Sequence, residues 1–255
     1  MKPVCDHPLE PAPLYDVWTA DTRTRRYRNE MLRYRRLLRM LPRRPAAVLD
    51  AGCGTGFMSV LMARRGWSVT AVDANPVSLA AFSDAAAAWN IRVHHADLFR
   101  FRAEPADALV CQEVLEHIPD DRAALKKMSD FLKPGGRAVF CVPYRENLNA
   151  KNVRCPKCGA AVHRSGHLRA YDEAGFAARI NETGFRVVRI ERIVNKRVVK
   201  WLASARLPVN GAALAFDRLV NGLFPGRAAY LAAVAEKRVP QNPHPAGAPD
   251  GRRER

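Results

Sequence analysis

Acidic residues are scarce in this sequence relative to basic ones. Its 255 residues include 25 Asp and Glu against 42 Lys and Arg, a formal net charge of +17. No run of 18 consecutive apolar residues occurs, so we expect no membrane-spanning helix. The first 14 residues lack the apolar run of a secretion signal. The basic excess favours an anionic partner: nucleic acid, a membrane surface or an acidic substrate.

Cysteine is also scarce, with six in the whole chain. That number is not typical of a disulfide framework in a chain of this length, and it favours a reducing, cytoplasmic compartment. A cytoplasmic protein with these features could also bind the membrane surface peripherally. Cys53, Cys111 and Cys141 fall in or beside expected strands, where we expect them to be small buried hydrophobic residues.

Apolar residues make up 48% of the chain, enough for a sizeable core. From residue 46, short apolar strands alternate with helices of ten or so residues, which predicts an α/β fold: a doubly wound, mostly parallel sheet with helices on both faces. Seven strands are expected, at 46–50, 68–73, 91–94, 108–111, 137–142, 185–193 and 229–237. Helices are expected at 22–41, 57–65, 76–89, 121–132, 172–183 and 196–223.

The first of these helices is amphipathic. Tyr27, Met31, Tyr34 and Leu38 recur at spacings of three and four. Its other face carries seven arginines, Arg33 among them, and that face is either solvated or a lid facing an anion.

The strongest motif is a glycine loop at the end of the first strand. Asp50 is followed by Gly52, Gly54 and Gly56, the spacing G-x-G-x-G. The dinucleotide fingerprint G-x-G-x-x-G would require its third glycine at Phe57. Glycine lets a ligand lie against the backbone, and the carboxyl end of a parallel strand is where open α/β sheets bind ligands. The acid before the loop suits a cationic ligand that carries an amine.

The segment Asp50–Gly56 resembles the first motif of class I S-adenosylmethionine-dependent methyltransferases. Asp73 at the end of the second strand, Asp97 after the third and the turn 134–136 before the fifth match further elements of that family in the right order. The resemblance is close over 46–142 and looser over 172–193 and 229–237. It implies that the glycine loop holds the methionine moiety, that Asp73 accepts hydrogen bonds from the ribose hydroxyls, and that Asp97 binds adenine. The cofactor-binding residues are then Asp50, Ala51, Gly52, Cys53, Gly54, Gly56, Asp73, Ala74, Asp97, Leu98 and Gln112.

The segment 112–119 is similar to the branch of the family that contains quinone-biosynthesis and other small-molecule O-methyltransferases. It follows the fourth strand and should face the sulfonium. Glu113 and His117 are the candidate catalytic residues, since such groups orient or deprotonate an acceptor hydroxyl. In the quinone enzymes a similar E-x-x-E-H run is implicated in binding a divalent cation, and Glu113, Glu116 and His117 match it. The alternative is that Glu113 contacts the cofactor while Glu116 and His117 cap or pack the next helix.

An insertion after the fifth strand contains Cys155, Cys158, His163 and His167, with the spacing C-x2-C-x4-H-x3-H. Four such ligands would close a structural zinc site. The alternatives are zinc held by the two cysteines with other ligands, His167 serving the active site, or thiols and histidines with no metal. The insertion should wall the acceptor pocket, and the candidate lining residues are Tyr144, Arg145, Asn147 and Arg169.

Basic residues alternate with apolar ones, Trp201 among them, near the start of the helical segment 196–224. This pattern is typical of a packed lid, of a helix that docks on a membrane surface, or of an RNA contact.

We divide the chain into five segments. They are an irregular lead with the amphipathic helix (1–45), the S-adenosylmethionine-binding core (46–143), the Cys/His insertion (144–171), the rest of the fold with the basic helical insertion 196–224 (172–238), and a tail expected to be disordered (239–255).

The leading functional hypothesis is methyl transfer from S-adenosylmethionine to a small-molecule or lipid-linked acceptor, on oxygen. The second hypothesis is an RNA methyltransferase with a structural zinc module, which the positive net charge favours. Against it, the sequence has no separate RNA-binding fold and no Asn-Pro-Pro-Tyr-type tetrapeptide after the fourth strand. The third hypothesis is a non-enzymatic S-adenosylmethionine-binding partner protein. The absence of Asp50, Asp73 or the glycines would have favoured it, but the sequence contains all of them.

Overall fold

The structure, a computed structural model, describes residues 17–239. The tail expected to be disordered lies outside the described residues, apart from its first residue. The strands are β1 (Ala47–Ala51), β2 (Ser68–Asp73), β3 (Arg92–His95), β4 (Ala106–Gln112), β5 (Leu132–Pro143), β6 (Asn152–Arg154), β7 (Ala161–His163), β8 (Phe185–Asn195) and β9 (Ala228–Lys237). The helices are α1 (Arg25–Met40), α2 (Phe57–Ala63), α3 (Pro76–Ala80), α4 (Ser83–Ala88), α5 (Asp121–Asp130), α6 (Glu173–Asn181), α7 (Lys196–Ser204) and α8 (Gly211–Leu223), with short 3-10 helices η1 (Asn149–Lys151) and η2 (Pro225–Arg227).

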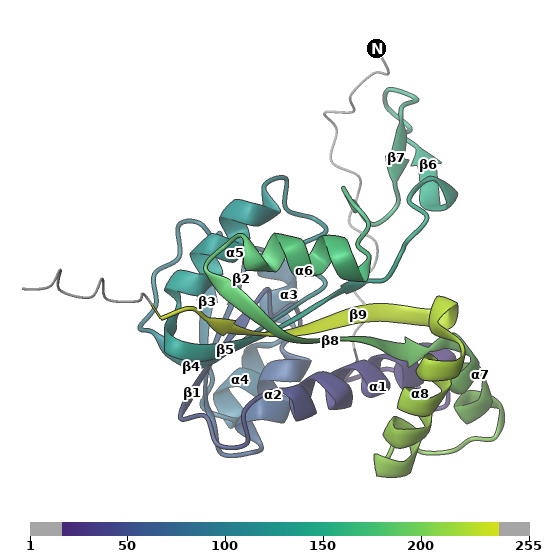
Figure 1. Cartoon of the computed structure of the whole chain (residues 1–255), viewed down its shortest axis with the longest axis horizontal. Coiled ribbons are helices and arrows are strands. Elements are labelled where there is room, and N and C mark those ends of the chain that lie inside the picture. The colour runs from purple at the N-terminus through teal and green to yellow at the C-terminus, as the bar shows by residue number, and fades with distance from the viewer. Residues whose placement is uncertain (1–16, 240–255) are drawn as a thin grey trace, which may run out of the picture.

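The main sheet has seven strands in the order β3-β2-β1-β4-β5-β9-β8 (Figure 1). The five strands from β3 to β5 pair in parallel, and β9 runs antiparallel to both of its neighbours. This topology confirms the α/β fold class and the seven strands. It also places the carboxyl ends of β1, β2, β4, β5 and β8 at one edge of the sheet.

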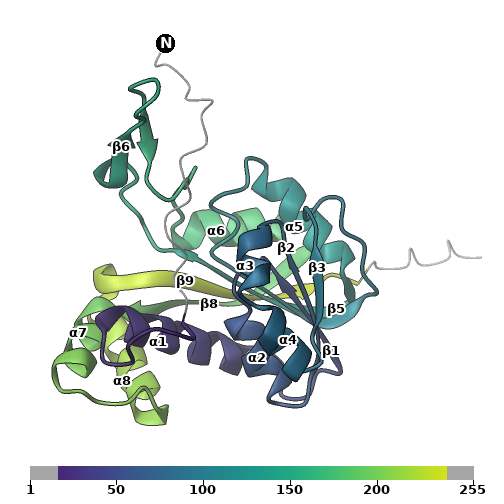
Figure 2. The ribbon, with the colours of Figure 1, turned by 180° about the vertical axis from the view of Figure 1, so that it is seen from behind.

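Helices cover both faces of this sheet, because side chains along each strand point alternately to one face and the other. Val48 and Val110 pack with residues of α1, α2, α4, α7 and α8, whereas Leu49 and Leu109 pack with α5 and α6. Figure 2 shows α1, α7 and α8 on one side of the sheet and α5 and α6 on the other. Cys53, Cys111 and Cys141 are buried, as expected.

The helix expected over 76–89 is interrupted, and α3 and α4 take its place. Phe82 lies at the break and is fully buried. A Cβ at Gly56 would stand 2.1 Å from the Phe82 ring. The break therefore lets an aromatic side chain fill the space beneath the glycine loop, which propensity alone does not show.

The other differences concern loops and ends. The fifth strand begins at Leu132 rather than 137, so the turn 134–136 lies within β5, with Gly135 at a φ of +73°. The insertion contains a hairpin of β6 and β7 that projects away from the main sheet (Figure 1). The segment 196–223 forms two helices rather than one. Among residues 17–239, no helix combines the length and apolar character that crossing a bilayer requires.

Candidate active site

A cavity of about 640 Å³ opens at the carboxyl edge of β1, β2 and β4. Ligands bind at this edge in open α/β sheets. Eleven of the residues predicted for the cofactor and for catalysis line it: Ala51, Gly52, Cys53, Gly54, Asp73, Ala74, Asp97, Leu98, Gln112, Glu113 and His117. The other two, Asp50 and Gly56, do not line it.

The glycine loop folds from the end of β1 over the end of β2. The N–H groups of Gly52 and Cys53 both donate to the carbonyl oxygen of Val72, at 2.8 and 3.1 Å. Gly52 has a φ of +79°, and a Cβ there would stand 2.2 Å from Val114 Cγ2, so only glycine fits. Around Gly54, no heavy atom of residues 17–239 other than those of Gly54 and its two chain neighbours lies within 4 Å of where a Cβ would stand. The loop is thus packed at Gly52 and open at Gly54.

Two backbone hydrogen bonds fix the carboxylate of Asp73. Its Oδ2 accepts from the Gly54 N–H and its Oδ1 from the Asn75 N–H, both at 2.8 Å. Each carboxylate oxygen can accept about two hydrogen bonds, so both retain capacity for donors in the cavity. Asp97 is fixed in a similar way, because its Oδ1 accepts from the Phe99 N–H at 2.8 Å. These two acids stand on the cavity wall as pre-oriented acceptors.

Asp50 has a different place from the one the sequence suggested. Its side chain is fully buried beneath the loop, where the Ser59 hydroxyl donates to its Oδ2 at 2.6 Å. Its Oδ1 has no hydrogen-bond partner among the described residues. Burial raises the pKa of Asp50 to about 7. The carboxyl group thereby ties β1 to α2 beneath the loop.

Glu113 reaches the cavity from an uncommon backbone conformation, with a φ of +56°. Its Oε2 lies 2.8 Å from Nη1 of Arg33, a buried side chain that also pairs with Glu30. The Glu113 side chain is 32% exposed, and that exposed part faces the cavity. The surrounding protein nevertheless desolvates the carboxylate and raises its pKa, while the positive charge of Arg33 opposes that rise.

Arg33 is a site residue that the sequence analysis missed. The sequence predicts a solvated or anion-facing position for its side chain, yet it is buried and lines the cavity with Tyr34. The available signal was Glu30, the only acid in α1, three residues before Arg33 and therefore on the same side of the helix.

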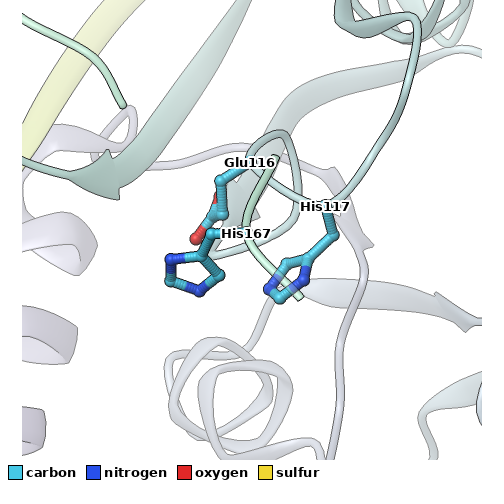
Figure 3. A group of neighbouring side chains, drawn as sticks. All are labelled: Glu116, His117 and His167. Atoms are coloured by element: carbon cyan, nitrogen blue, oxygen red, sulfur yellow. The ribbon is translucent and has the colours of Figure 1, made fainter. Parts of the chain in front are cut away.

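Three side chains gather beside the cavity: Glu116, His117 and His167 (Figure 3). One ligand atom from each lies within 4.8 Å of the others. Glu116 is fully buried, and neither of its carboxylate oxygens has a hydrogen-bond partner among residues 17–239. Burial, together with the nearby Glu113, raises the pKa of Glu116. Burial and the neighbouring His167 lower the pKa of His117 to about 4, so its imidazole is neutral at pH 7.

The insertion supplies His167 together with a carboxylate that orients it. His167 Nδ1 pairs with Glu146, which also pairs with Lys151. His163 stacks on the His167 ring with centroids 4.6 Å apart. His163 Nδ1 accepts the N–H groups of Ser165 and His167, at 3.3 and 3.1 Å, so a neutral His163 carries its proton on Nε2. That tautomer has no lone pair on Nε2 for a metal ion.

The predicted set of Cys155, Cys158, His163 and His167 is not assembled. Among the described residues, the groups that could hold a metal contain histidine and glutamate, and neither cysteine. The register of the hairpin explains why. His163 pairs with Asn152, and Cys155 comes three residues after Asn152, so His163 and Cys155 lie about 10 Å apart along the hairpin at about 3.3 Å per residue. The cysteines lie in the turn that joins β6 to β7, while His167 packs against His117 of the segment after β4.

The four side chains proposed to line the acceptor pocket do not line the cavity. Arg169 instead holds the segment 115–119 from outside. Its guanidinium donates to the carbonyl oxygens of Leu115, Ile118 and Pro119. Leu168 also donates its N–H to Glu116 O at 2.8 Å. The insertion therefore positions the residues after β4, and reaches the site itself through His167.

Comparison with known proteins agrees with this architecture. A family model described as "Methyltransferase domain" matches residues 23–190, more than half of the chain. A ubiquinone biosynthesis O-methyltransferase of Xylella fastidiosa (strain 9a5c) is 38% identical over 102 residues, which are 38% of this chain and 42% of that protein. The corresponding protein of Xanthomonas axonopodis pv. citri (strain 306) is 41% identical over 97 residues, covering 36% and 41%. The matched region thus spans about two fifths of these curated relatives.

Solved structures share the fold at low sequence identity. An S-adenosylmethionine-dependent methyltransferase from Mesorhizobium loti has a TM-score of 0.58 at 16% identity, covering 87% of this chain and all of that one. The [4+2]-cyclase SpnF also has a TM-score of 0.58, at 17% identity and 90% and 89% coverage, so this fold alone does not specify a reaction. The family match and the fold together settle the membership: the chain belongs to the methyltransferase domain family and has the fold of class I S-adenosylmethionine-dependent methyltransferases.

Proposed function

We propose that this protein transfers a methyl group from S-adenosylmethionine to a hydroxyl oxygen of a small-molecule or lipid-linked acceptor. One observation carries the proposal: a single cavity joins the glycine loop, Asp73 and Asp97 to Glu113 and His117. The O-methyltransferases named above, with about 40% identity over the matched region, support oxygen as the methylated atom.

The residues of the cavity fit the cofactor. Open space beside Gly54 allows a ligand to lie against the loop, and Asp73 presents two acceptor oxygens, as a vicinal diol requires. Hydrogen bonds to such a charged group contribute roughly 1.5–3 kcal/mol each. Asp97 would bind the adenine, with Leu98 beside it. When bound, S-adenosylmethionine supplies a methyl group already activated by its sulfonium, so the protein need not provide a covalent nucleophile.

The chain's own contribution to the chemistry is then positioning and proton transfer. His117 is neutral at pH 7 and stands at the cavity wall, so its ring nitrogen can accept the proton of the acceptor hydroxyl. That oxygen would take up the methyl group, and the electron pair of the broken carbon–sulfur bond would remain on the cofactor's sulfur. Glu113, held by Arg33, would orient the hydroxyl toward the methyl group.

A divalent cation is the further component that the family resemblance implies. Glu113 is engaged by Arg33, so the residues that would hold an ion are Glu116, His117 and His167, with Glu146 orienting His167. The buried, unpartnered carboxylate of Glu116 fits this role. A cation there would acidify the acceptor hydroxyl, and His117 would be its ligand instead of the proton acceptor. Metal analysis of the purified protein, with Glu116→Gln as the control, distinguishes the two roles of His117.

The test supplies S-adenosylmethionine with a labelled methyl group to the full chain and an extract of its own host. Products are separated into organic-soluble, small aqueous and acid-precipitable fractions, with Asp73→Asn as the inactive control. Label in a small or organic-soluble product, released by chemistry that cleaves methyl ethers, is the expected result. Nuclease-sensitive label in the precipitate would support the RNA methyltransferase instead, and cofactor binding without any transfer would support a non-enzymatic binding protein.

A further inference from the structure

We propose that the exposed face of α7, α8 and η2 docks this protein on the surface of an anionic lipid bilayer. The inference rests on the proposed function, since it would bring a lipid-linked acceptor to the cavity. Its evidence is separate, however, because no residue of α7, α8 or η2 lines the cavity.

Large apolar side chains are exposed on this docking face. They are Trp201, Phe216, Leu219, Leu223 and Phe224, with exposed fractions between 40% and 65%. Phe216, Leu219 and Leu223 follow one another at i, i+3 and i+7, which is one stripe of α8. The ring of Trp201 lies 5.3 Å from that of Phe216, so the stripe continues onto α7. Contiguous exposed apolar surface of this kind marks a site of interaction.

The segment that carries the apolar stripe is also rich in positive charge. Six exposed basic side chains lie in the same segment: Lys196, Arg197, Lys200, Arg206, Arg218 and Arg227. Asp217 is the only acid between residues 196 and 227, and it is buried. The guanidinium of Arg197 stands 4.0 Å over the Phe224 ring, so cation and apolar group share one surface. Basic and apolar residues together are what an anionic membrane surface attracts.

The docking face is preformed by buried hydrogen bonds. Asp217 accepts the N–H groups of Val194 and Asn195, at 3.0 and 2.6 Å, and so ties α8 to the start of α7. Val194 has a φ of +61°, an unusual conformation for a β-branched residue that these contacts hold in place. Arg28 of α1 donates to Leu207 O at 3.1 Å. The two helices are therefore fixed to the domain in one arrangement, as a binding surface requires.

Topology places this face at the edge of the sheet where the cavity opens. β8 runs in the same direction as β5, because both are antiparallel to β9, and α7 follows β8 directly. α1, which packs against α7, also contributes Arg33 and Tyr34 to the cavity wall. Docking would hold the cavity near the lipid surface. A symmetric dimer through this face would oppose two clusters of like charge, so the bilayer is the better occupant.

Vesicle co-sedimentation of the full chain, without cofactor or acceptor, tests the proposal independently of methyl transfer. We expect at least tenfold more binding to vesicles of phosphatidylcholine with 30% phosphatidylglycerol than to phosphatidylcholine alone. Trp201→Ala with Leu219→Ser should reduce binding at least tenfold. Trp89→Ala is the matched control, because Trp89 is 41% exposed outside the face, and it should bind like the wild type.

The variants with substitutions in the docking face should keep the wild-type affinity for S-adenosylhomocysteine, which would show that they are folded. Arg197→Glu with Lys200→Glu should remove the preference for anionic vesicles, since Arg197 lies over the Phe224 ring of the face. Equal binding to neutral and anionic vesicles, or equal loss in the Trp89→Ala control, would overturn the proposal. Light scattering provides a further test. Self-association that depends on protein concentration and is abolished by the Trp201 and Leu219 substitutions would also overturn the proposal, because the face would then join two copies of the chain.

Discussion

The part of the cavity that we propose binds the cofactor (the cofactor half) and the part that we propose faces the acceptor (the acceptor half) are built in different ways. In the cofactor half, the glycine loop, Asp73 and Asp97 lie at or just beyond the ends of β1, β2 and β3, and backbone hydrogen bonds fix them. In the acceptor half, side chains arrive from three separate parts of the chain: Arg33 from α1, Glu113 to His117 from the segment after β4, and His167 from the insertion. The cofactor half is thus specified by local sequence and backbone geometry, and the acceptor half by tertiary packing of charged groups.

The largest expected effect is in the acceptor half. His117→Gln keeps the size and polarity of the side chain but cannot take up a proton. We expect methyl transfer to fall by about 100-fold or more, the range of general base catalysis, with affinity for S-adenosylhomocysteine unchanged. Turnover and calorimetric binding measure the two quantities. His94→Gln, at an exposed histidine outside this cavity, is the control, and a similar loss of turnover there would remove the base role from His117.

Removing Arg33 tests the ion pairs that hold the acceptor half. Arg33→Met leaves Glu30 and Glu113 without their shared cation, and should lower the free energy of unfolding by about 3 kcal/mol at pH 8. The deficit should shrink toward pH 5, because burial raises the pKa of Glu113 and the folded variant then takes up a proton there. Chemical denaturation measures both. Arg39→Met, exposed on the same helix, should change stability by no more than about 0.5 kcal/mol.

Glycine substitutions test the cofactor half in turn. Gly56→Ala would drive a Cβ to 2.1 Å from the Phe82 ring and should cost about 2 kcal/mol or more of stability. Gly66→Ala is the matched control, with a similar positive φ of +79° and no heavy atom of the described residues within 4 Å of its Cβ position. It should cost about 1 kcal/mol, the conformational strain alone. Equal melting temperatures in the two variants would show that the Phe82 contact does not determine the loop.

An effect that depends on pH concerns Asp50. Its pKa is raised to about 7, so between pH 4 and 7 the unfolded chain loses this proton while the folded chain keeps it. Wild-type stability contributed by this group therefore falls as the pH rises through that window. Asp50→Asn cannot ionise and should gain about 1 to 3 kcal/mol relative to the wild type from pH 4.5 to 7.5, at about 1.4 kcal/mol per pKa unit. A stability difference independent of pH would mean that Asp50 is ionised in the folded protein.

The same comparison explains how far the sequence could predict the site. The sheet, the glycine loop, Asp73 and Asp97 could be predicted, because strand periodicity and the residues just after each strand are local features. The burial of Arg33 could not, since α1 contacts Glu113 across about 80 residues of chain. Cys155 and His163 lie close in sequence, yet the pairing of β6 with β7 keeps them apart. Spacing shows which residues could reach one site, and packing decides which do.

Calorimetric binding of S-adenosylhomocysteine to the full chain tests the account most directly. We predict that one molecule binds per chain. Asp73→Asn should reduce the affinity at least tenfold, because the lost charged hydrogen bonds contribute roughly 1.5–3 kcal/mol each. His117→Gln should leave the affinity unchanged. Absence of binding by the wild-type chain, or equal loss in both variants, would contradict a cavity divided into a cofactor half and an acceptor half.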